Sequence, residues 1–279
     1  SLSAVVPPER AAALLVRVAT DGGDDRIDCA VRAGCVPLLM GVLKERTESK
    51  ARTPSLRTLC NILTGSAEAT QAVIDAGALQ LMLPLVQHAK KGIRKEACWT
   101  ISNITAGNKD QIQSVVDANV IPPLVNLLNS AEFDIRKEAA WAISNATSGG
   151  TPEQIKFLVS QACIPPLCEL LSVADVKIII VALEALENIL KVGDAESKQM
   201  GGHNLMANHI ADSEGLKKIE DLQQHDNNDI YEKAVRVLET YFGVDEEDVN
   251  VAPETIGNNF AFGVAQNTPQ KAFDFGPGM

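Results

Sequence analysis

Two segments of the chain carry side chains whose types and spacing suit the binding of an extended peptide. They hold Glu96, Trp99 and Asn103 in the first segment, and Glu138, Trp141 and Asn145 in the second. An Asn amide offers two donors and an acceptor, so it can pair with both polar groups of an extended backbone. Adjacent indole rings form a slot for the stem of Lys or Arg, with a cation–π attraction of about 0.5–2 kcal/mol. Because a carboxylate can accept the charged head, these residue types predict a basic peptide as ligand.

The spacing within each segment predicts that these side chains share one face of a helix. At 100° per residue, Glu138, Trp141, Asn145 and Ser148 fall on one arc, and the smaller apolar residues fall on another. The apolar arc holds Ile135, Ala139, Ala142, Ile143 and Ala146. The alternative is that each Trp belongs to the core and each Asn bonds the backbone of the next repeat. We favour a binding surface, because the Trp lies off the apolar arc in both copies.

The helices that must position these residues are repeated. Ile93–Gly107 and Ile135–Gly149 are identical at 11 of 15 positions and start 42 residues apart. Four marker residues, Asn61, Asn103, Asn145 and Asn188, keep nearly the same interval. Such periodicity is typical of stacked repeats, in which no single unit can bury its own apolar face.

Each repeat reads as three helices, and about five repeats fit between residues 24 and 243. Residues 1–23 are expected to hold the last helix of a preceding repeat, and the final, more polar repeat is expected to cap the array. Glycines 65, 107, 149 and 193 are expected to end helices. Asn108 with Gln111, and Thr151 with Gln154, have the spacing of capping boxes. Residues 244–279 are acidic at first and then poor in apolar residues, so we predict a disordered tail whose four Phe residues either dock a partner or have no role.

Composition narrows the function further. The net charge of −11 argues against binding to nucleic acid and favours a basic partner. Aliphatic side chains must build the core, since 46% of residues are hydrophobic but only 4% are aromatic. No apolar run has the length of a membrane span, and the six cysteines are expected to be buried free thiols of a protein without disulfides. We expect no metal and no cofactor, because the four histidines have no ligand-like neighbours.

The motif W-x-x-x-N, inside EACWTISNITAG and EAAWAISNATSG, resembles importin-α, and the resemblance extends over nearly the whole chain. It implies an all-α, right-handed armadillo-repeat solenoid that carries proteins with nuclear localisation signals between cytoplasm and nucleus. The chain would correspond to the C-terminal repeats, which hold the family's minor signal-binding site. The implied peptide-binding residues are Trp99, Asn103, Trp141 and Asn145, followed by Glu96, Ser102, Glu138 and Ser148, and then Asn61.

This sequence departs from the Trp pattern on both sides of the two segments. The position four before the marker Asn is Arg57 in the preceding repeat and Glu184 in the following one, although Asn61 and Asn188 are kept. These substitutions predict a site limited to about two Trp pockets. An acidic residue that the family places after the Asn61 helix is displaced here by Ser66 and Ala67, which puts one Lys contact in question.

The resemblance also implies partners besides the cargo. The terminal repeat and the acidic tail resemble the region used by the nuclear export receptor that recycles importin-α. Importin-β is expected as a partner only where a basic N-terminal segment exists, and none precedes Pro7 in this sequence. The sequence leaves open whether it is a fragment or a short form.

Two other classes of function compete with a signal receptor. A general armadillo scaffold would present Arg and Lys along the site instead of Glu96 and Glu138. An enzyme would need a nucleophile with a base, or a metal constellation, and no motif surrounds any histidine. We therefore predict a binding protein without enzymatic activity.

Overall fold

A computed structural model describes residues 24–45, 49–243, 254–256 and 259–261. The chain divides into two units, Ser1–Phe242 and Gly243–Met279. The expected helix within residues 1–23 lies outside the described residues, as does most of the predicted tail.

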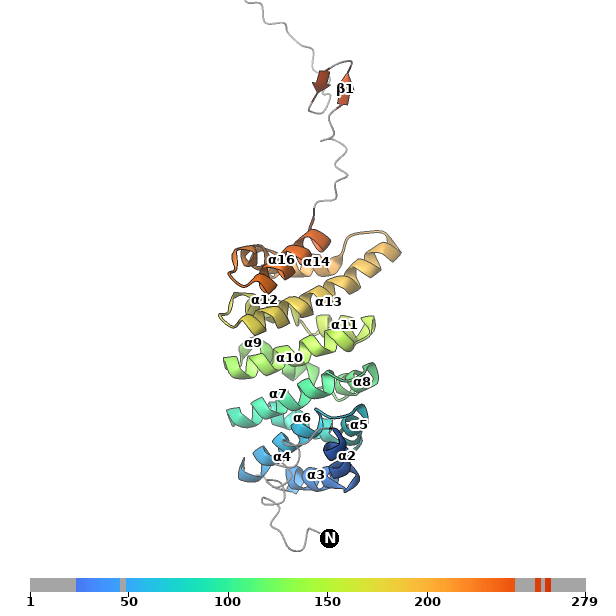
Figure 1. Cartoon of the computed structure of the whole chain (residues 1–279), viewed down its shortest axis with the longest axis vertical. Coiled ribbons are helices and arrows are strands. Elements are labelled where there is room, and N and C mark those ends of the chain that lie inside the picture. The colour runs from blue at the N-terminus through green and yellow to red at the C-terminus, as the bar shows by residue number, and fades with distance from the viewer. Residues whose placement is uncertain (1–23, 46–48, 244–253, 257–258, 262–279) are drawn as a thin grey trace, which may run out of the picture. The chain divides into compact units, whose positions relative to one another are not determined.

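Helices fill the described part of the first unit and follow the predicted order of three per repeat. They are α2 (Asp24–Arg32), α3 (Cys35–Glu45) and α4 (Ser49–Ile62); α5 (Ala67–Asp75), α6 (Ala78–Val86) and α7 (Lys91–Thr105); α8 (Lys109–Asp117), α9 (Ile121–Ser130) and α10 (Phe133–Gly149); α11 (Pro152–Ser160), α12 (Ile164–Glu169) with η2 (Leu170–Ser172), and α13 (Val176–Met200); and α14 (Leu205–Asp212), α15 (Gly215–Asp221) with η3 (Leu222–Gln224), and α16 (Asn228–Tyr241). The third helices α4, α7, α10, α13 and α16 stack in sequence order (Figure 1). This arrangement confirms the predicted all-α armadillo solenoid.

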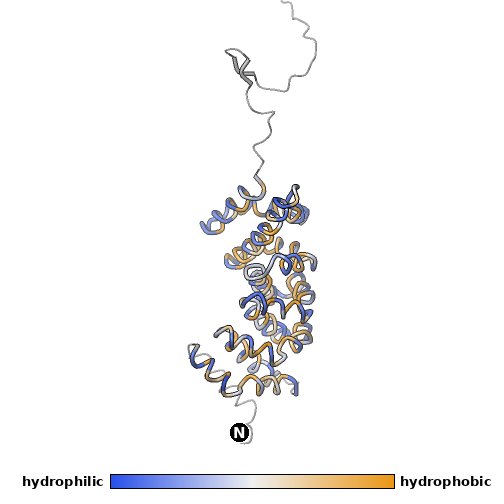
Figure 2. The backbone as a smooth tube through the Cα atoms, turned by 90° about the vertical axis from the view of Figure 1, so that its right-hand side faces the viewer, coloured by the Kyte–Doolittle hydropathy of each residue, from blue (hydrophilic) through white to orange (hydrophobic). Residues whose placement is uncertain are grey.

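The core is aliphatic and runs through all the repeats. The predicted apolar arc of α10 is fully buried at Ile135, Ala139, Ala142, Ile143 and Ala146. Figure 2 shows polar and apolar residues mixed along the helices of this unit, as expected when each helix buries one face. Among the described helices none is by itself long and apolar enough to cross a membrane. Two bent helix pairs, α5 with α6 and α11 with α12–η2, match a membrane span in length and composition only.

The cysteine prediction is confirmed at five positions and wrong at one. All six thiols are free, and those of Cys35, Cys60, Cys98, Cys163 and Cys168 are buried. Burial raises the pKa of the Cys98 thiol to about 12, which keeps it protonated and unreactive. Cys29 is exposed instead, because it lies on the solvent side of the short helix α2.

Both predicted capping boxes are present. Asn108 and Gln111 cap α8 reciprocally, and Thr151 and Gln154 do the same for α11. In both cases the Gln side chain also reaches the preceding repeat, which the sequence pattern did not indicate.

The prediction that Gly193 ends a helix is wrong, because α13 continues to Met200. A Cβ at Gly193 would collide with Asn204 Oδ1 and lie 2.7 Å from Met206 Cγ. Glycine therefore serves here to let the start of α14 approach the C-terminal part of α13, and the helix ends at Met200 with Gly201 as its cap at a φ of 69°.

The second unit contains a short hairpin where the sequence predicted no strand. Strand β1 (Glu254–Ile256) pairs antiparallel with β2 (Asn259–Ala261), with Thr255 opposite Phe260. The intervening dipeptide Gly257-Asn258 is of a type that is common in the turns of two-stranded hairpins.

Candidate peptide-binding site

The two Trp side chains lie on neighbouring third helices and share a cavity. Trp99 on α7 is half-buried, and Trp141 on α10 is 41% exposed, so neither ring belongs to the core. They line an open cavity of about 210 Å³, which we call the indole cavity. Its lining residues are Trp99, Ser102, Asn103, Glu138, Trp141 and Asn145, all of which the sequence had singled out.

The marker Asn residues also tie successive repeats together. Asn103 Nδ2 donates to the carbonyl of Cys60 at 3.2 Å, and Asn145 Nδ2 donates to the carbonyl of Ser102 at 2.9 Å. This agrees in part with the alternative interpretation, in which each Asn bonds the backbone of the next repeat. The bonded carbonyl belongs to the preceding repeat instead. One amide hydrogen is used in this way, and no other hydrogen bond of either amide is recorded within the described residues. The internal bond therefore fixes the orientation of an amide that keeps its oxygen and a second hydrogen for another partner.

The third marker bond has a different form. Asn188 Nδ2 donates to Thr147 Oγ1 at 3.3 Å and to Ser148 Oγ at 3.2 Å. Neither Asn188 nor Ser148 is among the lining residues of the indole cavity, and Asn61 is half-buried on α4, also outside it.

Glu96 and Glu138 have different surroundings in the structure, although both were expected to bind a cation of the peptide. Glu138 lines the indole cavity, and its nearest cation, Lys95, lies 3.9 Å away. Burial raises the pKa of Glu138, and the nearby charge of Glu96 adds to this rise. Glu96 is instead bound to Arg57, whose Nε lies 2.7 Å from Glu96 Oε1. Glu138 is therefore the carboxylate available to a cation in the cavity.

Ion pairs occupy the positions where the Trp pattern stops. Arg57 pairs with Glu96 on one side. On the other, Glu184 Oε1 lies 3.0 Å from Lys233 Nζ, and Glu187 pairs with Arg236 at 3.3 Å. The charged replacements of Trp thus join repeats to each other, which agrees with a site of two indoles.

A second cavity of about 530 Å³ adjoins the first and shares Asn103 with it. We call it the helix-end cavity, because the ends of α4 and α7 and the starts of α5 and α8 enclose it. Its lining residues are Leu63, Thr64, Gly65, Ala67, Thr70, Asn103, Ala106, Gly107, Asn108 and Gln111. The carbonyl ends of α4 and α7 carry a partial negative charge and the starts of α5 and α8 a partial positive one, so a cation here would rely on local oxygen ligands such as the hydroxyls of Thr64 and Thr70. Sequence reasoning missed this cavity, although the predicted capping box had placed Asn108 and Gln111 at the start of α8.

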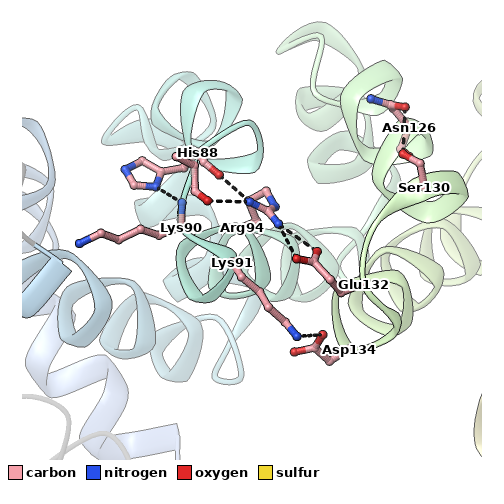
Figure 3. A network of polar contacts seen from close by, with 9 residues as sticks. His88, Lys90, Lys91, Arg94, Asn126, Ser130, Glu132 and Asp134 are labelled. Atoms are coloured by element: carbon pink, nitrogen blue, oxygen red, sulfur yellow. Dashed lines mark hydrogen bonds and ion pairs between the residues drawn. The ribbon is translucent and has the colours of Figure 1, made fainter.

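Salt bridges at the other end of the third helices hold α7 against α10 (Figure 3). Arg94 binds both oxygens of Glu132, at 2.9 and 3.0 Å, and Lys91 Nζ lies 2.9 Å from Asp134 Oδ1. A backbone hydrogen bond and Arg94 lower the pKa of Glu132, and the bond from Lys91 lowers the pKa of Asp134. These contacts help to fix the distance between the helices that carry the two indoles.

Nothing in the described residues resembles a metal site, since no group of three or more His, Cys, Asp or Glu side chains could hold an ion.

Comparison with known proteins places the chain among armadillo-repeat proteins. The armadillo/beta-catenin-like repeat model matches residues 66–106, 108–148 and 151–191, and the atypical Arm repeat model matches residues 204–254. A designed armadillo repeat protein solved in complex with the peptide (KR)4 has a TM-score of 0.74 and 33% identity, covering 83% of this chain and 92% of its own.

Comparison with curated sequences narrows the family further. Importin subunit alpha-1b of Oryza sativa subsp. japonica is 54% identical over 92% of this chain, and importin subunit alpha-3 of Arabidopsis thaliana is 53% identical over 92%. These matches cover 48% and 49% of the two relatives, so the chain spans about half their length. Together with the armadillo repeats and the repeated Trp and Asn residues, these relatives show that the chain belongs to the importin-α family.

Proposed function

We propose that this chain is a nuclear import adaptor segment that binds Lys/Arg-rich nuclear localisation signals in extended conformation. The observation that carries the proposal is the indole cavity, where two Trp rings, two Asn amides and Glu138 converge. The methylene stem of one Lys or Arg side chain lies between the two indoles, and its charged head meets Glu138.

The geometry of the stack suits an extended backbone. Packed helices lie about 8–10 Å apart, and an extended chain advances about 3.3 Å per residue. One Asn therefore serves roughly every third residue of the peptide. Asn103 and Asn145 bind main-chain groups in this scheme, so they hold the peptide without reading its sequence.

The helix-end cavity supplies a second place for a cation. It holds the side chains of Thr64 and Thr70 beside the carbonyl end of α4. A Lys ammonium is a compact charge with three donors, and it can bond several neutral oxygens at once. This cavity takes the place of the acidic contact that Ser66 and Ala67 displace.

The electrostatics favour this function over a general armadillo scaffold. Glu138 lies in the indole cavity, and the nearby Arg57 is committed to Glu96. A scaffold for acidic segments would need free cations at these positions.

The other expected partners belong to the same proposal. Recycling by a nuclear export receptor would involve the terminal repeat, α14 to α16, and the acidic residues that follow it. Importin-β would be a partner only through a basic N-terminal segment. Shuttling between cytoplasm and nucleus follows from these exchanges.

A titration of a fluorescent Lys/Arg-rich peptide tests the proposal. Trp99→Ala combined with Trp141→Ala should abolish measurable binding, and rising salt should weaken the binding of the unmodified chain. Tyr231→Ala is the matched control, since Tyr231 is an exposed aromatic residue of α16 outside both cavities. Equal affinities of the double variant and the unmodified chain would rule the indole cavity out.

A further inference from the structure

Gln111 connects two repeats at the wall of the helix-end cavity. Its side chain is buried, and Nε2 donates to the carbonyl of Ala67 at 2.9 Å, with Gln71 Oε1 at 3.5 Å. Its Oε1 accepts from the backbone N–H of Asn108 at 3.2 Å. One carboxamide thus caps α8 and holds α8 against the start of α5.

The backbone beside Gln111 leaves room for this arrangement. A Cβ at Gly107 would collide with Gln111 Oε1. Gly107, Gln111 and Ala67 all line the helix-end cavity. The bond from Gln111 to Ala67 therefore joins the part of the cavity wall formed by α8 to the part formed by α5 and fixes the distance between them.

The next repeat contains the same device outside the indole and helix-end cavities. Gln154 Nε2 donates to the carbonyl of Lys109 and to Gln113 Oε1, both at 2.9 Å, and its Oε1 accepts from Thr151 N–H at 2.9 Å. Gln154 is also buried, yet it lines neither of the two cavities described above. The contribution of the device to folding can therefore be measured separately from any contribution to binding.

We propose that Gln111 is a positioning residue for cation binding in the helix-end cavity, and that it sharpens the preference of this cavity for Lys over Arg. The inference rests on the proposed function. A compact ammonium bonds well only if the oxygens around it are close together, whereas a wider guanidinium fork tolerates a looser site. Loss of the cross-wall bond should therefore weaken Lys binding selectively.

The test compares Gln111→Met with Gln154→Met, two substitutions that keep side-chain length and remove the same hydrogen bonds. Each variant is titrated with labelled (KR)4 and with an all-Arg peptide of equal length. Thermal unfolding should shift equally in both. Only Gln111→Met should raise the Kd for (KR)4, by roughly fivefold, as expected for one hydrogen bond, while the Kd for the all-Arg peptide changes less.

A second variant guards against loss of folding in the first. Gly107→Ala keeps every polar group and displaces the Gln111 carboxamide by contact, so it should produce the same selective loss. The inference is overturned if a folded Gln111→Met or Gly107→Ala chain keeps the Lys-to-Arg preference of the unmodified chain, or if Gln154→Met changes it equally. Failure of the unmodified chain to bind either peptide would instead refute the proposed function.

Discussion

Arg57 and Glu96 form an ion pair that is buried on one side only. Their side chains are 59% and 9% exposed, and Arg57 Nε lies 2.7 Å from Glu96 Oε1. Glu96 Oε2 is buried without a hydrogen-bond partner in the described residues. The carboxylate thus depends on a single cation from the preceding repeat, at the position where the Trp pattern is interrupted.

Removing that cation should destabilise the fold. We expect Arg57→Ala to lower the free energy of unfolding by about 1–3 kcal/mol, because Glu96 would be left charged and buried. Urea denaturation measures the change. Glu96→Gln in the Arg57→Ala background should recover part of the loss, and a double variant less stable than Arg57→Ala would contradict this account.

Peptide binding should depend on pH through Glu138. Its pKa is raised by burial, and a bound cation would favour the ionised form and lower that pKa. As the pH falls through the raised pKa, the group becomes protonated and the affinity for a basic peptide should drop. Fluorescence anisotropy from about pH 7.5 to about pH 4.5 measures this.

Glu138→Gln is the control for that titration. It should weaken binding at neutral pH and flatten the pH dependence. For the free chain the sign is opposite, because a carboxyl with a raised folded pKa gains stability as the pH falls through that pKa. A variant with the same pH profile as the unmodified chain would assign the titration to another group.

Ala162→Gly should stabilise the chain. The junction between the first and second helix of each repeat has a positive φ, at Gly34, Gly77, Asn119, Ala162 and Glu214. Ala162 has a φ of 62°, which is costly for a residue with a Cβ, so glycine should raise the free energy of unfolding by about 0.5–1 kcal/mol.

Ala118→Gly is the matched control, since Ala118 precedes the equivalent junction residue with a right-handed φ of −74°. There the added backbone freedom should lower stability by about 0.5–1 kcal/mol. Thermal denaturation of both variants measures these changes. Equal shifts of the melting temperature in the same direction would show that the positive φ of Ala162 carries no cost.

Gly193→Ala should destabilise the contact between α13 and α14. A Cβ there would collide with Asn204, whose side chain accepts from Met206 and Ala207 N–H and caps α14. We expect a loss of about 1–3 kcal/mol from overpacking and the displaced cap.

Gly41→Ala provides the comparison, because no heavy atom lies within 4 Å of the position of its Cβ in α3. Alanine there should gain about 0.5–1 kcal/mol. If both glycine variants gained stability in urea denaturation, Gly193 would have no packing role.

The sequence alone determined the repeat, its three helices and the arc that carries Trp99, Trp141 and the marker Asn residues. These follow from helical periodicity, which is local, and from a 42-residue self-similarity that needs no coordinates. The capping boxes at Asn108 and Thr151 were equally readable, since their partners lie three residues away.

Which groups meet between repeats depends on how the helices pack in three dimensions. Glu96 and Glu138 have the same local sequence, but Arg57 reaches the first and Lys95 lies only near the second. Likewise Gly193 has the spacing of a helix end, yet Asn204 packs against it and α13 continues. Such differences arise from side chains about 40 residues away or from the next helix, so no local pattern contains them. The repeated sequence places the two Trp residues on neighbouring helices. Contacts between repeats pair Glu96 with Arg57 and leave Glu138 beside the indoles.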